Sequence, residues 1–338
     1  MHARNPFTRS LPGLVGLAVL AVMVGACLLS LPCTLGRGSS GTARYAEQVA
    51  PARQLPPWWL GSWGLPSDPI KRAEVEDRIE ATRQATGATP RYWMGSDLLG
   101  RSLLIRVLAG GGISLTIGLA AAALSVFLGT TYGALAGYVG GRTDAVMMRI
   151  VDILYGLPYI LLVVLLAVAV SATTERWQIE RGADFSPATN QLIGICTLFI
   201  AIGGVSWLTM ARVVRGQVLS LKSQPFMEAA RAMGTPVTRQ FTRHLLPNLI
   251  GPITVYTTLT VPQAILQESF LSFLGIGVRP PLPSWGNLAA DGLTELNPYQ
   301  SRWWLLFFPC AMLGLTLLAL NFVGEGLREA LDPKGRRR

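Results

Sequence analysis

Long apolar runs constrain this chain more than any other feature of its sequence. The first, residues 11–32, has about the twenty residues that a helix needs to cross a bilayer. Five further runs cover 113–139, 145–172, 192–214, 251–275 and 303–323. Half of the 338 residues are hydrophobic and only 14% are charged, which excludes a typical soluble domain. The sequence therefore predicts an all-α membrane protein with six transmembrane helices.

The first run has an alternative interpretation as a cleaved signal. Val24-Gly25-Ala26-Cys27 faintly resembles a lipoprotein cleavage site. Gly25 fits that site poorly, and the apolar run continues past the cysteine. We therefore expect the first span to be retained.

Cysteine and histidine usage argues against a catalytic or metal site. The four cysteines form no CxxC pair and three lie in apolar runs, as small buried hydrophobes do. One histidine, His2, is terminal, and His244 lies in a polar segment, so no histidine cluster exists. We predict no catalytic residue and no metal site. The net charge of +10 would suggest nucleic acid in a soluble protein, but here its distribution matters more, and we expect no nucleic-acid partner.

Basic residues predict the orientation in the membrane. Six spans place both termini on one side, and assigning that side to the cytoplasm gives the short inner segments fifteen Lys and Arg. The short outer loops then hold four: Arg176, Arg181, Arg279 and Arg302. Long loops count little in this rule. Residues 1–10 are thus predicted to be cytoplasmic, and residues 33–94 to form an extracytoplasmic insert.

The insert and two of the apolar runs carry local structural signals. In the insert, Ser67-Asp68-Pro69 predicts a helix start and Gly87 its end, the tryptophans of PPWWLGSW suit the membrane interface, and most of the remainder reads as a solvated loop. Gly129, Gly133 and Gly137 recur every fourth residue and predict a helix-packing face. Asp144 is placed to cap the span 145–172, which Pro158 is expected to kink.

The polar segment 223–247, SQPFMEAARAMGTPVTRQFTRHLLP, is flanked by spans on both sides. Pro225 suits the first turn of a helix, with Glu228 near its positive end. Gly234 suits the left-handed position that ends the helix. Thr235 and Pro236 are expected to start a second helix, as N-cap and first residue, which continues to Pro247. Two short exposed helices indicate a docking element.

This segment resembles the EAA loop of ABC-transporter permeases. In that family the loop forms a coupling helix that sits in a cleft of the cytoplasmic ATPase. The resemblance implies a coupling loop over 215–250 and assigns ATPase coupling to these residues: Glu228, Ala229, Ala230, Arg231, Gly234, Leu246 and Pro247. His244 replaces the usual apolar residue two places before Leu246.

Three further stretches extend the resemblance over most of the chain from Gly95 onward. GSDLLGRSLLIRVLAGGGISL (95–115) is similar to the GTDxLGRDxLSRxxxGxRxSL region of peptide-type permeases, with Ser102 where Asp is usual. ESFLSFLGIGVRPPLPSWGN (268–287) and NFVGEGLREALDPK (321–334) resemble the same subfamily. The chain thus looks like a C-type permease subunit for dipeptides, oligopeptides or nickel, with the type I ABC importer fold over 95–338.

The resemblance implies partners. They are a second, B-type permease, two cytoplasmic ABC ATPase subunits that hold ATP and Mg²⁺, an extracytoplasmic solute-binding protein and the lipid of the bacterial inner membrane. No cofactor is expected on this chain. It has no GxxxxGK[ST] phosphate loop, and no Lys follows a Gly, so energy must come from a partner.

Other classes of protein remain as alternatives. A secondary transporter would need a coupling charge in mid-membrane, for which Glu268 is the single candidate. A membrane receptor without an ATPase would leave the polar segment 223–247 unexplained. Within the transporter class, the residues alone do not identify the solute or the pore lining.

Overall fold

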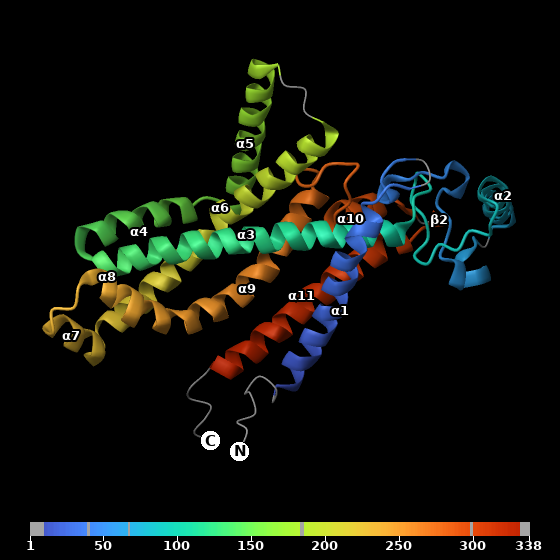
Figure 1. The fold of residues 1–338 in the computed structure, drawn as a ribbon. Coiled ribbons are helices and arrows are strands. Elements are labelled where there is room, and N and C mark those ends of the chain that lie inside the picture. Colours follow the sequence, from blue (N-terminus) through green and yellow to red (C-terminus); the bar gives the residue numbers. More distant parts are fainter. Residues whose placement is uncertain (1–9, 39–40, 67, 183–185, 298–299, 332–338) are drawn as a thin grey trace. The chain divides into compact units, whose positions relative to one another are not determined.

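The structure is a computed structural model that describes residues 10–38, 41–66, 68–182, 186–297 and 300–331 (Figure 1). Within these residues, six helices are long and apolar enough to cross a membrane. They are Leu11–Thr34, Leu103–Val139, Tyr159–Glu180, Thr189–Lys222, Val237–Phe273 and Trp304–Ala330. The prediction of an all-α, six-span membrane protein is confirmed.

The chain forms two compact units. Unit 1 comprises Met1–Leu17, Ile117–Ile265 and Ala319–Arg338, and unit 2 comprises Ala18–Thr116 and Leu266–Leu318. Four long helices contribute residues to both units: α1 (Leu11–Thr34), α3 (Leu103–Val139), α9 (Leu246–Phe273) and α11 (Trp304–Leu331).

The predicted single span 145–172 is wrong. This stretch is divided between α4 (Gly141–Tyr155) and α5 (Tyr159–Arg181). Pro158 lacks a backbone N–H and disfavours helical geometry in the residue before it, so the helix ends instead of kinking. The apolar span is α5, which continues past the predicted end at residue 172 to Arg181. It lies beside α6 (Pro187–Lys222), as Figure 1 shows.

The glycine row on α3 faces α6. A Cβ atom on Gly133 would lie 2.2 Å from the carbonyl oxygen of Ala211. At Gly129 it would lie 2.5 Å from Met210 Cβ, and at Gly137 2.9 Å from the Arg215 carbonyl oxygen. No larger side chain fits at these distances, so the glycines allow the backbones of two long apolar helices to approach closely.

The polar segment of unit 1 forms α7 (Pro225–Ala232), α8 (Val237–Gln240) and the π-helical turn η5 (Phe241–Leu245). The expected helix end at Pro247 is wrong, because η5 continues directly into α9. Pro247 has no N–H to give to the residue four places earlier. In the π turn, the N–H of Leu246 reaches back five residues to the Phe241 carbonyl, which accommodates a proline at the start of α9.

Unit 2 contains the insert. Three 3₁₀ turns, η2 (Arg44–Ala46), η3 (Ala50–Ala52) and η4 (Trp58–Gly64), precede α2 (Pro69–Thr86). The Asp68 side chain accepts the N–H of Ile70, and Gly87 adopts a left-handed conformation, as the sequence predicts for this helix. The insert is therefore more structured than a solvated loop.

The helix that follows Ser284 packs against the first turns of α3. Helix α10 (Trp285–Thr294) starts with a capping box between Ser284 and Asn287. Trp285 is fully buried, and its indole N–H donates to the Val107 carbonyl of α3 at 3.1 Å. A short antiparallel pair follows, β1 (Leu296–Asn297) with β2 (Gln300–Ser301), in which Leu296 faces Ser301.

Candidate functional site

Helix α7 is amphipathic and anchored by one face. Met227 and Ala230, three residues apart, are both buried. Met227 belongs to the apolar core of unit 1, whose other fully buried members come from α3, α6, η5 and α9: Ala134, Met210, Val214, Val218, Leu245 and Leu249. The buried face holds α7 on the ends of the spans.

The opposite face of α7 is open. Glu228, Ala229 and Arg231 are exposed, together with the apolar side chains of Phe226 and Met233. Met233 alone is 77% exposed. Figure 1 shows α7 at one end of unit 1. An exposed surface that carries apolar and charged side chains, on a helix whose other face is buried in the core, is suited to contact with another protein.

A Schellman motif ends α7. Gly234 has a φ of +68°, its N–H donates to the Arg231 carbonyl at 2.9 Å, and the N–H of Thr235 donates to the Ala230 carbonyl at 3.1 Å. The left-handed Gly234 agrees with the prediction. The predicted N-cap is displaced by one residue, because Thr235 closes this motif and Pro236 becomes the N-cap of α8.

Leu246 and Pro247 lie in the first turn of α9, not in α7, and both are exposed. Their neighbours Leu245 and Leu249 are fully buried in the core that also holds Met227. The Leu-Pro pair thus marks the place where the polar segment re-enters the long apolar helix.

Gln240 connects this segment to α3, and Lys222 connects the end of α6 to α3. Sequence reasoning singled out neither side chain. The buried Gln240 amide donates to the Thr235 carbonyl at 2.6 Å and accepts the Tyr138 hydroxyl at 3.1 Å. The Lys222 ammonium donates to the Tyr138 and Gly137 carbonyls at 2.6 and 3.3 Å. It thereby satisfies carbonyls that the last turn of α3 leaves unpaired.

Ion pairs hold α4 against α6. Asp144 does not cap α4, whose N-cap is Gly140, and instead accepts two hydrogen bonds of 2.6 Å from Arg215. These hydrogen bonds lower the pKa of the Asp144 carboxyl below its usual range. Asp152 pairs with Arg212 at 2.8 Å.

The GSDLLGR stretch of unit 2 builds a buried charge cluster. One carboxylate oxygen of Asp97 accepts the N–H groups of Leu99 and Arg101, both at 2.9 Å. The other accepts the Arg101 and Arg106 guanidinium groups at 2.7 and 2.6 Å. Asp291, whose side chain is 54% exposed, lies 3.7 Å from Arg106 at the edge of the cluster. This arrangement fixes the entry into α3 and provides no site for chemistry.

Glu268, the single candidate for an ion-coupling charge, is fully buried in unit 2. The hydroxyls of Ser272 and Ser269 contact its carboxylate at 2.8 and 3.3 Å, and those of Ser114 and Ser284 also hydrogen-bond to it. A carboxyl group enclosed by four hydroxyls has its polar atoms satisfied within the fold. Ser269 and Ser272 of the ESFLSFLG stretch therefore serve as hydrogen-bond partners of the buried Glu268 carboxylate.

The described residues thus form a multi-pass membrane protein whose exposed helix α7 stands on a packed apolar base. The chain belongs to the family of binding-protein-dependent transport system inner membrane components, whose model matches residues 129–337. The resemblance to ABC-transporter permeases is thereby confirmed, as is the multi-pass membrane location.

Known proteins of this family are similar over most of their length. The oligopeptide transport system permease protein OppC of Haemophilus influenzae is 45% identical over 72% of this chain and 71% of its own. The dipeptide transport system permease protein DppC of Bacillus subtilis is 42% identical over 77% and 74%. OppC of Escherichia coli is 46% identical over 72% of this chain and 73% of its own length.

Proposed function

We propose that this chain is the C-type permease subunit of an ATP-driven importer of dipeptides or oligopeptides. The observation that carries the proposal is α7, which is anchored by Met227 and Ala230 and exposes Glu228 and Arg231. Relatives named as oligopeptide and dipeptide permeases support the substrate class. No comparison favours nickel, a secondary transporter or a receptor.

The exposed face of α7 would sit in a cleft of an ATPase subunit. Its residues Glu228, Ala229 and Arg231 would contact the partner, while the buried face transmits force to the spans. Force on α7 reaches α6 through the shared apolar core, and reaches α3 through Gln240 and Tyr138. The transport change is thus a movement of packed helices between two arrangements, with no bond broken on this chain.

The proposed complex contains a B-type permease, two ATPase subunits that bind ATP and Mg²⁺, and an extracytoplasmic solute-binding protein. Both termini and α7 would face the cytoplasm, and the insert would face outward. The charge asymmetry of the short loops supports this orientation.

The test compares Glu228→Gln with wild type in the reconstituted complex. Glutamine keeps the shape of the side chain and removes its charge, so α7 itself loses only about 0.3–1 kcal/mol of helix-terminus stabilisation. We expect normal subunit assembly, with peptide uptake and peptide-stimulated ATP hydrolysis both reduced.

A matched control is Arg142→Gln, an exposed charge in helix α4 outside the coupling loop. It should leave uptake near the wild-type rate. Full uptake by the double variant Glu228→Gln/Arg231→Gln would show that α7 is not the coupling element.

A further inference from the structure

Unit 2 contains a cavity of about 560 Å³ between the insert and the start of α11. This volume lies within the range of pockets that hold small molecules. Residues from the insert line one part of it, and Ser301 to Trp304 line another. None of the residues that line this cavity belongs to the polar segment 223–247. The coupling role proposed for α7 therefore does not explain the cavity.

One wall of the cavity is a charged stripe on α2. Asp68, Lys71, Glu74 and Arg78 follow one another at intervals of three or four residues, and therefore share a face of the helix. Their charges alternate in sign. Successive positions lie about 4.5–6 Å apart along the axis at 1.5 Å per residue. Such a wall is complementary to a solute with both an ammonium and a carboxylate group.

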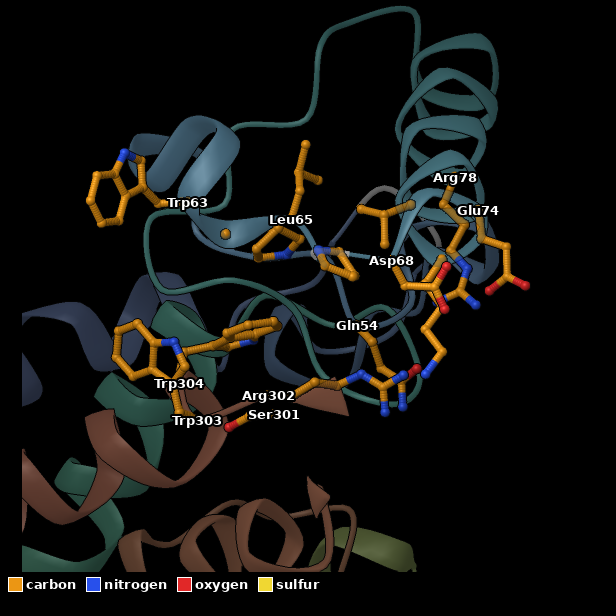
Figure 2. A pocket seen from close by; sticks show the side chains of 15 residues that line it. Gln54, Trp63, Leu65, Asp68, Glu74, Arg78, Ser301, Arg302, Trp303 and Trp304 are labelled. Atoms are coloured by element: carbon orange, nitrogen blue, oxygen red, sulfur yellow. The ribbon is translucent and has the colours of Figure 1, made fainter. Parts of the chain in front are cut away.

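The other wall is aromatic. Figure 2 shows Trp63, Trp303 and Trp304 on one side of the cavity, opposite Asp68 and Arg78. Trp63 is 92% exposed, so its ring has little contact with the protein. Trp304 is 5% exposed, and its indole N–H has no hydrogen-bond partner among the described residues. The exposed Trp63 ring on the cavity wall provides an apolar surface on which a ligand side chain can pack.

We propose that this cavity binds short zwitterionic peptides of two or three residues. The peptide ammonium group contacts Glu74, its carboxylate contacts one of the two flanking cations, Lys71 or Arg78, and an apolar side chain packs on the tryptophans. The separation of opposite charges on α2 is comparable to one or two extended residues of roughly 3.3–3.6 Å each. The choice of peptides among zwitterions rests on the proposed function, whereas the place of the site does not.

Because the insert would face outward, the site would bind peptide on the extracytoplasmic side, before transport. It differs from the coupling helix in unit 1, and its occupancy requires no ATP. Binding is therefore measurable in the complete permease complex in lipid nanodiscs, without nucleotide and without the solute-binding protein.

The experiment titrates the dipeptide Ala-Phe into this complex by calorimetry. We expect saturable binding to wild type, and at least tenfold weaker binding of N-acetyl-Ala-Phe-amide, which lacks both charges. The variant Lys71→Gln/Arg78→Gln should weaken Ala-Phe binding at least tenfold, and Trp63→Ala should weaken it several-fold. The matched control is Arg72→Gln/Arg83→Gln, which removes two cations from the same helix outside the cavity.

Three results would overturn the proposal. In the first, wild type fails to bind Ala-Phe although the complete importer takes it up, which leaves the proposed function intact. In the second, glycerophosphoethanolamine occupies the cavity and Ala-Phe does not, which assigns it to a lipid headgroup. In the third, the Lys71→Gln/Arg78→Gln variant binds Ala-Phe normally but loses stimulation of ATP hydrolysis by the binding protein, which assigns the stripe to protein docking. Binding to the cavity by an importer that transports no peptide would instead reject the proposed function alone.

Discussion

The Tyr138 hydroxyl donates a hydrogen bond of 3.1 Å to the Gln240 side chain, which joins residues 102 positions apart in the sequence. Tyr138 lies in the last turn of α3, and Gln240 lies at the end of α8 and is bound to the turn after α7. Lys222 adds bonds from the end of α6 to the same turn of α3. The ends of α3, α6 and α8 are thus connected by side-chain hydrogen bonds.

Tyr138→Phe is expected to weaken coupling more than stability. The variant leaves the buried Gln240 oxygen without its donor, at a cost of about 1–3 kcal/mol. Peptide uptake per ATP hydrolysed should fall in the reconstituted complex. Tyr132→Phe is the control, because the Tyr132 hydroxyl donates to the Met147 carbonyl at 2.9 Å and does not reach the α7 segment. Equal uptake per ATP in the two variants would contradict a coupling role for Tyr138.

Gly234→Ala tests whether the Schellman motif after α7 is needed for coupling. A Cβ at Gly234 meets no atom within 4 Å, so the substitution adds only the strain of a left-handed residue, about 1–2 kcal/mol. We expect reduced transport with normal insertion. Gly87→Ala has the same kind of strain at φ +70° and the same open space, at the end of α2. If both variants transport alike, the geometry of this turn does not matter for coupling.

Gly133→Ala is expected to lower the melting temperature of the purified complex. Its Cβ would lie 2.2 Å from the Ala211 carbonyl oxygen, so α3 and α6 must move apart. Gly216→Ala on α6 has nothing within 4 Å and should be neutral, or stabilising by roughly 0.5–1 kcal/mol through the better helix propensity of alanine. A melting temperature that is unchanged for Gly133→Ala would show that this face does not pack as described.

Asp144→Asn should lower stability at neutral pH, and the difference from wild type should disappear in acid. The hydrogen bonds from Arg215 depress the pKa of Asp144 in the folded state, so the pair contributes above the unfolded value of about 3.9 and is lost as the pH falls through the folded value. We expect an effect on the order of 1 kcal/mol, because Arg215 is one-third exposed. Melting curves at pH 7 and below pH 4 measure it.

The control for this prediction is Asp152→Asn, which breaks the more exposed pair with Arg212. Its effect at pH 7 should be smaller, because solvent screens exposed charges. A loss in Asp144→Asn that stayed constant down to pH 3 would show that the carboxylate charge is not the source of the stability.

Single-cysteine labelling tests the orientation. In a chain whose four native cysteines are replaced by alanine, Thr86→Cys in the insert should react with a membrane-impermeant thiol reagent in intact cells. Thr238→Cys, at an exposed position in α8, should react only after permeabilisation. The opposite pattern would reverse the assignment of the two sides.

The sequence by itself determined where several helices begin and end and how many spans the chain has. The Asp68 cap and Gly87 end of α2, the Pro225 start and Gly234 end of α7, and the number of spans all follow from backbone chemistry within a few positions or from apolar length. The same signals predicted an exposed docking helix, because a polar segment between two membrane spans must lie outside the bilayer.

Only the tertiary structure decided which distant groups meet. Asp144 has the residue type and position of a helix cap, yet Arg215, 71 positions away, binds it, because α4 packs on α6. The division at Pro158 was equally ambiguous, since a proline kinks some helices and ends others according to the packing around it. Contacts such as Tyr138 with Gln240, and the charged stripe of α2 opposite the tryptophans, require segments that no sequence spacing brings together.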